Sequence, residues 1–73
     1  MSQTQMDEVE KLAAVVQGMP PGDEKTLHIE AEFRSKEPSI ALKNALEKYL
    51  SEKHIRFKCI EIEGSHDHFR VET

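Results

Sequence analysis

The residues best suited to chemistry in this chain gather in the run Gly64 to Arg70, GSHDHFR. His66 and His68 lie two apart, so on an extended strand they would project to the same side, where two imidazoles can share a metal ion. The remaining ligands would have to come from His28, His54, Cys59 or Asp67. Because no C-x-x-C or H-E-x-x-H spacing accompanies them, we predict no metal site and no cofactor.

The triplet Ser65-His66-Asp67 has the letters of a catalytic triad without its geometry. Nucleophile, base and acid must meet through space, and adjacent residues cannot converge on one reacting centre. Each of the glycines of the chain is isolated, and none joins a strand directly to a helix, so no phosphate-binding loop is indicated.

The same run carries a family resemblance. From about Leu42 to Arg70, the order of helix, strand and Gly-Ser-His-x-x-Phe resembles the beginning of the HicA family of toxin ribonucleases, which are small proteins similar to double-stranded-RNA-binding domains. The resemblance implies that His66 is the catalytic residue, with Gly64 and Ser65 shaping the turn and Phe69 anchoring the next strand. An exposed histidine that titrates near neutral pH suits general acid–base cleavage of RNA.

The charge of the chain is high and unevenly distributed. The net charge of −4 argues against a general nucleic-acid binder of the basic kind. Residues 34 to 58 nevertheless carry seven basic against three acidic groups, which leaves open a local anion-binding face. Its members would be Arg34, Lys36, Lys43, Lys53, Arg56 and Lys58. Exposed helices commonly carry mixed charge, so a solvated face is the more ordinary interpretation.

One long helix, residues 38 to 53, would position these groups. Its apolar residues follow the i, i+3, i+4, i+7, i+8 pattern of a helix that buries one face, and they are Leu42, Ala45, Leu46, Tyr49 and Leu50. A strand over residues 55 to 62 follows, in which the apolar residues change parity between Cys59 and Ile60. Either a β-bulge causes this change, or Ile60 and Ile62 form a face that a partner covers.

The N-terminal part predicts a helix over residues 5 to 17 and a Pro/Gly linker that ends at Gly22. Residues 1 to 22 either pack under the sheet or form an arm that docks on a partner. Strict alternation predicts a strand from Thr26 to Arg34, and a last strand from His68 to Thr73 makes an antiparallel hairpin with the preceding strand.

These elements predict one α+β domain, residues 1 to 73, with the order α-β-α-β-β. We expect a three-stranded mixed sheet with both helices on one face, because strand–helix–strand connections are usually parallel. The last strand would lie either between the other two or at the edge. Such a sheet has two free edges, and unguarded edges invite pairing with another chain. Self-association into a homodimer is therefore expected.

The single cysteine, the absence of a signal peptide and the lack of a long apolar run predict a cytoplasmic protein without membrane contact. With no complete catalytic constellation, the sequence favours a non-enzymatic interaction or regulatory module. It would act through a sheet edge or through its acidic first helix. The alternative hypothesis is an RNA-binding or HicA-like ribonuclease domain that uses His66.

Overall fold

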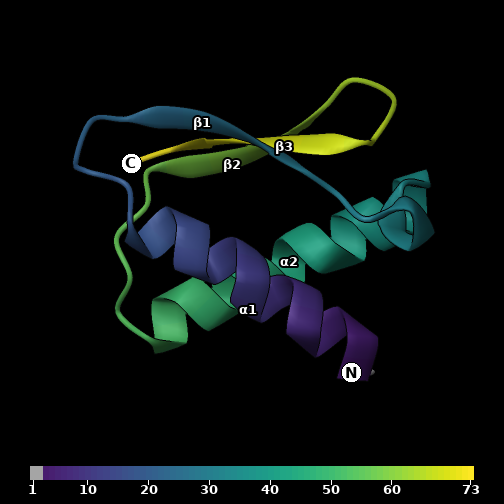
Figure 1. Cartoon of the computed structure of the whole chain (residues 1–73), viewed down its shortest axis with the longest axis horizontal. Helices are drawn as coiled ribbons and strands as arrows, with labels where there is room; N and C mark the ends of the chain where they lie inside the picture. Colours follow the sequence, from purple (N-terminus) through teal and green to yellow (C-terminus); the bar gives the residue numbers. More distant parts are fainter. Residues whose placement is uncertain (1–2) are drawn as a thin grey trace.

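Two helices cover one face of a three-stranded sheet in the computed structural model, which describes residues 3–73 (Figure 1). The elements in chain order are α1 (Gln3–Gln17), β1 (Glu24–His28), the 3₁₀ helix η1 (Ala31–Phe33), α2 (Lys36–Glu52), β2 (Cys59–Glu63) and β3 (His68–Glu72). The α+β class and the α-β-α-β-β order predicted from the sequence are confirmed.

The sheet has the strand order β1-β3-β2, and β3 is antiparallel to both of its neighbours. The expectation of a mixed sheet is therefore wrong. β1 and β2 do run in the same direction, as expected on either side of a helix, but they do not pair. The β2–β3 hairpin folds β3 back into the space between them, so every pairing in the sheet is antiparallel.

Helix α2 begins two residues earlier than predicted, with Ser35 in extended conformation at its N-cap. Pro38 is tolerated because it lies in the first turn, where N–H groups have no partner within the helix. At the other end His54 takes the place of the usual glycine, with φ of 57°. The amide of Ile55 donates to the Leu50 carbonyl and that of His54 to the Ser51 carbonyl, which is the Schellman pattern.

The core lies between α2, α1 and the inner face of the sheet. Leu42, Leu46 and Leu50 of α2 are fully buried, and so are Phe69 and Val71 of β3. The register places Phe69 between Leu27 and Ile62, so its ring occupies the middle of the sheet. The predicted apolar stripe of the long helix is thus the stripe that the protein buries.

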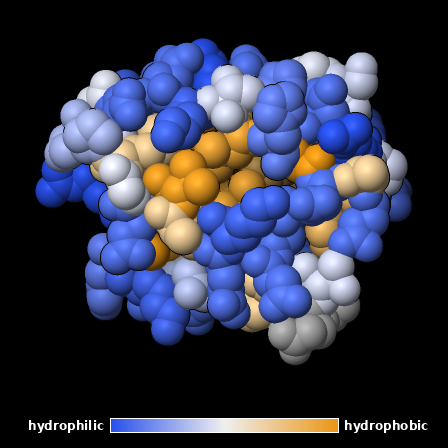
Figure 2. Space-filling view, in the orientation of Figure 1, coloured by the Kyte–Doolittle hydropathy of each residue, from blue (hydrophilic) through white to orange (hydrophobic). Residues whose placement is uncertain are grey.

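Helix α1 packs on its own domain, which answers the question that the sequence left open for residues 1 to 22. Its buried side chains are Val9, Leu12, Ala13 and Val16. Figure 2 shows apolar side chains in a band between the sheet and α1, with hydrophilic residues around it. Within the described residues 3 to 22, this helix is not a free arm. Met1 and Ser2 lie outside the described residues.

Glu8 is the buried acidic residue of α1. Only 4% of its surface is exposed, and its carboxylate accepts a hydrogen bond from the Glu30 amide at 3.3 Å. Burial disfavours the charged form and raises the pKa of Glu8 above its ordinary value. Lys11 pairs with Glu30 at 3.0 Å beside it, so α1 is fastened to the segment that follows β1.

The parity change before Ile60 is accommodated within one molecule. The Lys58 amide donates to the Glu72 carbonyl at 2.7 Å, and Glu72 is also the register partner of Cys59. Two consecutive residues therefore oppose one residue of β3, which is the arrangement of a β-bulge, one residue earlier than predicted. Of the two residues of the predicted partner face, Ile60 is 3% exposed and belongs to the core, and Ile62 is partly buried against it.

Two predicted strand boundaries are also wrong. The strand expected from Thr26 to Arg34 ends at His28, and Ala31–Phe33 forms η1 instead. The ladder stops because its last bond, from the Ile29 amide to the Asp67 carbonyl, already reaches the hairpin turn. Beyond Asp67 no residue of β3 remains for the chain to pair with. Similarly, Ile55 and Phe57 precede β2 rather than belong to it, although both pack against the core.

We expect Phe69→Ala to lower the free energy of unfolding by about 3–5 kcal/mol, because it leaves a cavity in the middle of the sheet. A domain of this length has about 4–11 kcal/mol in total, so the variant would lose much of its stability. Ile40→Ala on α2 is the control, since Ile40 is 41% exposed and its loss should change stability by less than about 0.5 kcal/mol. Equal shifts of both variants in urea denaturation would contradict this core.

Candidate functional site

The sheet face away from the helices consists of polar and titratable side chains. Leu27, Phe69, Val71 and Ile60 point toward the helices, so their neighbours along each strand point to the other side. This open face comprises Glu24, Thr26 and His28 of β1, His68, Arg70 and Glu72 of β3, and Cys59, Glu61 and Glu63 of β2. Both helices lie on the opposite side of the sheet (Figure 1).

Carboxylates dominate the electrostatics of the open face, since four glutamates share it with a single arginine. Arg70 lies between two of them. Its guanidinium is hydrogen-bonded to Glu61, and its Nε lies 3.5 Å from Oε2 of Glu63. One guanidinium cannot neutralise both carboxylates, so the β2 side of the open face stays negative.

The Cys59 thiol donates to Oε2 of Glu72 at 2.9 Å. This bond, with partial burial and the charge of the carboxylate, raises the pKa of the Cys59 thiol. The same bond lowers the pKa of Glu72. A thiol held protonated in this way is a weak nucleophile, so the arrangement does not suit covalent catalysis.

The hairpin turn holds the residues of the HicA-like motif. Gly64 and His66 both have positive φ, 68° and 64°, so His66 is not on an extended strand and does not share a side with His68 as the strand geometry required. The Ser39 hydroxyl, buried on α2, lies 2.9 Å from the His66 carbonyl and 2.6 Å from the Phe33 carbonyl. These contacts fasten the turn to the N-terminal part of α2.

The imidazole of His66 has a buried Nδ1 with no hydrogen-bond partner within residues 3–73. His68 instead contacts Asp67 at 2.8 Å and lies edge-on to His28, with ring centroids 6.1 Å apart. In the described part of the chain, no group of three or more His, Cys, Asp or Glu side chains is placed to hold a metal ion.

Five of the six basic residues of the predicted anion face lie at the two ends of α2, and Lys43 lies near its middle. Arg34 and Lys36 lie at its N-terminal end, where Nε of Arg34 donates to the Ile29 carbonyl. Lys43 is paired with Glu47 at 3.3 Å. Lys53, Arg56 and Lys58 follow the C-terminal end. Because α2 has 17 residues, about 25 Å of helix separates the ends, and the six cations do not form one face.

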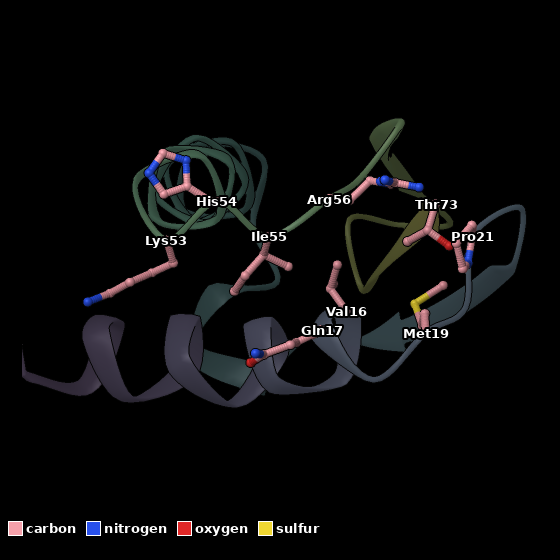
Figure 3. A pocket seen from close by; sticks show the side chains of 9 residues that line it. All are labelled: Val16, Gln17, Met19, Pro21, Lys53, His54, Ile55, Arg56 and Thr73. Atoms are coloured by element: carbon pink, nitrogen blue, oxygen red, sulfur yellow. The ribbon is translucent and has the colours of Figure 1, made fainter.

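A cavity of about 250 Å³ opens between the C-terminal end of α1 and the segment after α2. Lys53, His54 and Arg56 line it together with Val16, Gln17, Met19, Pro21, Ile55 and Thr73. Figure 3 shows Ile55 and Val16 pointing into the space between α1 and the end of α2, whereas Lys53 and His54 extend away from it. The Arg56 side chain extends in the opposite direction to that of Lys53 (Figure 3), so these two cations do not converge on one point where an anion could bind.

The alternation of hydrogen bonds along each strand determines which backbone N–H and C=O groups point to the free edges of the sheet. The Ile29 amide donates to the Asp67 carbonyl and the Thr73 amide to the Asp23 carbonyl, so odd-numbered residues of the β3 segment bond to β1. Even-numbered residues must then bond to β2, in agreement with the bond from Lys58 to Glu72. In β2 the N–H and C=O groups of Ile60 and Ile62 consequently point to the free edge.

The two free edges differ in how they are protected. Lys25 of β1 is in register with the buried Val71, in the row that faces the helices, yet it is exposed. A charge pointing inward from an edge strand disfavours the addition of another strand. The helix-facing positions of β2 are Ile60 and Ile62, which offer no such obstacle. β2 is therefore the unguarded edge.

Sequence reasoning expected a partner at a free sheet edge but could not say which edge, and it gave Ile60 and Ile62 a role through their side chains rather than through their backbone. It also began the first strand at Thr26, and so left out Lys25. The sequence did contain a signal for the guarded edge, because Lys25 lies two residues before Leu27 and so belongs to the same alternating row as Leu27 and Ile29.

No protein-family model, curated protein or solved structure matches this chain. The HicA-like role of His66 therefore stays a prediction. Neither helix in residues 3–73 has the length and apolar character needed to cross a bilayer.

We expect Gly64→Ala to destabilise the protein more than Gly22→Ala. Both glycines have positive φ, which costs an alanine about 1–2 kcal/mol. A methyl group at Gly22 meets nothing within 4 Å, whereas at Gly64 it would collide with the Asp67 carboxylate and the His68 ring. The collision should add about 1–3 kcal/mol. Thermal unfolding of both variants measures the difference, and equal losses would contradict this geometry of the turn.

We expect Glu72→Gln to make Cys59 more reactive. Removing the negative charge lowers the pKa of the thiol, so more thiolate is present at any mildly alkaline pH and alkylation by iodoacetamide becomes faster. Glu37→Gln, in the first turn of α2, is the control and should leave the rate unchanged. A Glu72→Gln rate equal to that of the unchanged protein would show that Glu72 does not control the thiol.

Proposed function

We propose that this protein is an interaction module that binds an extended segment of a partner protein as a fourth strand beside β2. The observation that carries the proposal is the β2 edge, where the N–H and C=O groups of Ile60 and Ile62 point outward and no inward-pointing charge guards them. Strand addition of this kind draws its affinity from main-chain hydrogen bonds.

The edge is a better candidate than the acidic first helix, which the sequence also suggested. The apolar stripe of α1 is already used in the core, where Val9 and Val16 are almost fully buried. A partner could bind this helix only through its polar side, whose charged groups would be exposed to solvent screening. The β2 edge, in contrast, has backbone donors and acceptors that point away from β3, toward the side on which a further strand would pair.

The charge distribution favours a protein segment over RNA. Binding of nucleic acid depends on cations that neutralise successive phosphates. Here the open face is rich in glutamate, and Arg34 and Lys53 lie at opposite ends of α2. His66, the residue of the alternative ribonuclease hypothesis, is flanked by Asp67, whose charge repels a phosphate.

The test uses a neutral synthetic peptide of alternating valine and threonine and measures amide hydrogen exchange of the full chain. We expect the peptide to slow exchange at Ile60 and Ile62. Ile62→Pro removes one outward donor without removing a bond to β3, and it should weaken binding by about tenfold.

Thr26→Pro is the matched control, because the Thr26 amide points to the free edge of β1 and its loss should leave peptide binding unchanged. Slow exchange at Phe69, whose amide bonds to β1, and at Arg70, whose amide bonds to β2, would establish in both variants that the sheet is intact. The proposal is wrong if the peptide fails to protect Ile60 and Ile62, or if both proline variants weaken binding equally.

A further inference from the structure

We propose that the segment bound at β2 alternates apolar and basic residues, with its lysines or arginines opposite Glu61 and Glu63. The inference rests on the proposed function, because it describes the partner of that same edge. Its starting point is the side chains of β2, which divide strictly between the two faces of the sheet.

The geometry of the edge determines which side chains the partner meets most closely. Ile60 and Ile62 would form the hydrogen-bonded pairs with an antiparallel fourth strand, so Glu61 and Glu63 fall in the intervening pairs. In those pairs the Cα atoms lie about 4.5 Å apart and the facing side chains approach most closely. The two glutamates therefore discriminate between partners more strongly than any other residue of the edge.

The charges at these positions call for a cation. Glu61 is 54% exposed and Glu63 is 40% exposed at the side chain, and both share the single guanidinium of Arg70, while Nε2 of His68 also lies 4.0 Å from Glu63. Glu72 lies on the same face, beside Arg70 and Cys59. A lysine or arginine of the partner opposite each glutamate would supply the positive charge that Arg70 alone does not. On the helix side, the partner would continue the apolar row of Ile60 and Ile62.

A second copy of this chain is a poorer occupant. The two-fold register that pairs all five residues of β2 puts Glu61 directly opposite the copy's Glu61. Moving two residues toward the hairpin sets Glu61 against the copy's Glu63. Either shift pairs only three residues of the strand, so the shift away from the hairpin, which sets Glu61 against the copy's Cys59, gives up two of the five paired residues. Like charges directly opposite one another are destabilising, so the homodimer expected from the sequence is disfavoured at this edge.

The experiment titrates the full chain with three peptides of equal length, in which valine alternates with lysine, with threonine or with glutamate. Binding is measured by isothermal calorimetry, and its position by amide exchange at Ile60 and Ile62. We expect the lysine peptide to bind about fivefold more tightly than the threonine peptide at low ionic strength. The glutamate peptide should bind most weakly, and added salt should narrow the differences.

The double variant Glu61→Gln/Glu63→Gln should remove the preference for lysine while retaining binding of the threonine peptide. Glu24→Gln/Glu32→Gln is the matched control, since it removes as many charges away from β2 and should retain the preference.

Three other results would contradict the basic partner, and they differ in what they imply for the strand-binding function. Equal affinity of all three peptides, with protection of Ile60 and Ile62, would overturn the basic partner and leave the strand-binding function standing. Tight binding of the lysine peptide without that protection would overturn both, because the peptide would then sit on the open face alone. Protection of Ile60 without peptide, together with a mass above 8.4 kDa in sedimentation, would identify a second copy as the occupant and overturn the basic partner.

Discussion

Both strand pairings of this sheet use β3, and the rest of the molecule depends on that constraint. β3 bonds to β1 through its odd-numbered residues and to β2 through its even-numbered ones, so neither of its edges is free. The same strand supplies Phe69 and Val71 to the core and Arg70 to the open face. Because β3 occupies the centre, one edge of β1 and one edge of β2 have no neighbouring strand. The position of β3 therefore determines which backbone groups point to a free edge.

Much of the fold could be predicted from local pattern. The long helix follows from the spacing of Leu42, Leu46 and Leu50, and the hairpin follows from Gly64 between two apolar runs. The sheet type could not be predicted, since strand–helix–strand connectivity does not say whether a third strand inserts between the first two. The ends of the strands could not be predicted from the sequence either. Ile29 and Phe33 continue the alternation of β1, but pairing stops where Ile29 meets Asp67, because β3 begins only at His68 and a strand cannot pair beyond the end of its neighbour.

The candidate site was harder to predict because it is made of backbone. The sequence pointed to a free sheet edge without saying which one, and among its side chains to His66, to six cations and to Ile60 and Ile62. The structure separates the cations along α2 and places Ile60 in the core. What remains at the edge is a set of amide and carbonyl groups whose direction depends on register. The role of Lys25 also depends on register, because its place in the helix-facing row is known only once Val71 is identified as its partner.

The acidic residues of β2 offer a reason why an unguarded edge can persist in a small domain. β1 is protected by steric and electrostatic means, through the exposed Lys25 in its helix-facing row. β2 keeps an apolar inner row, and its only charges lie on the other face. Carboxylates there oppose pairing with an identical strand, yet they attract a strand of opposite charge. Under the proposed function, repulsion between copies and recognition of a basic partner would thus arise from the same two side chains, Glu61 and Glu63.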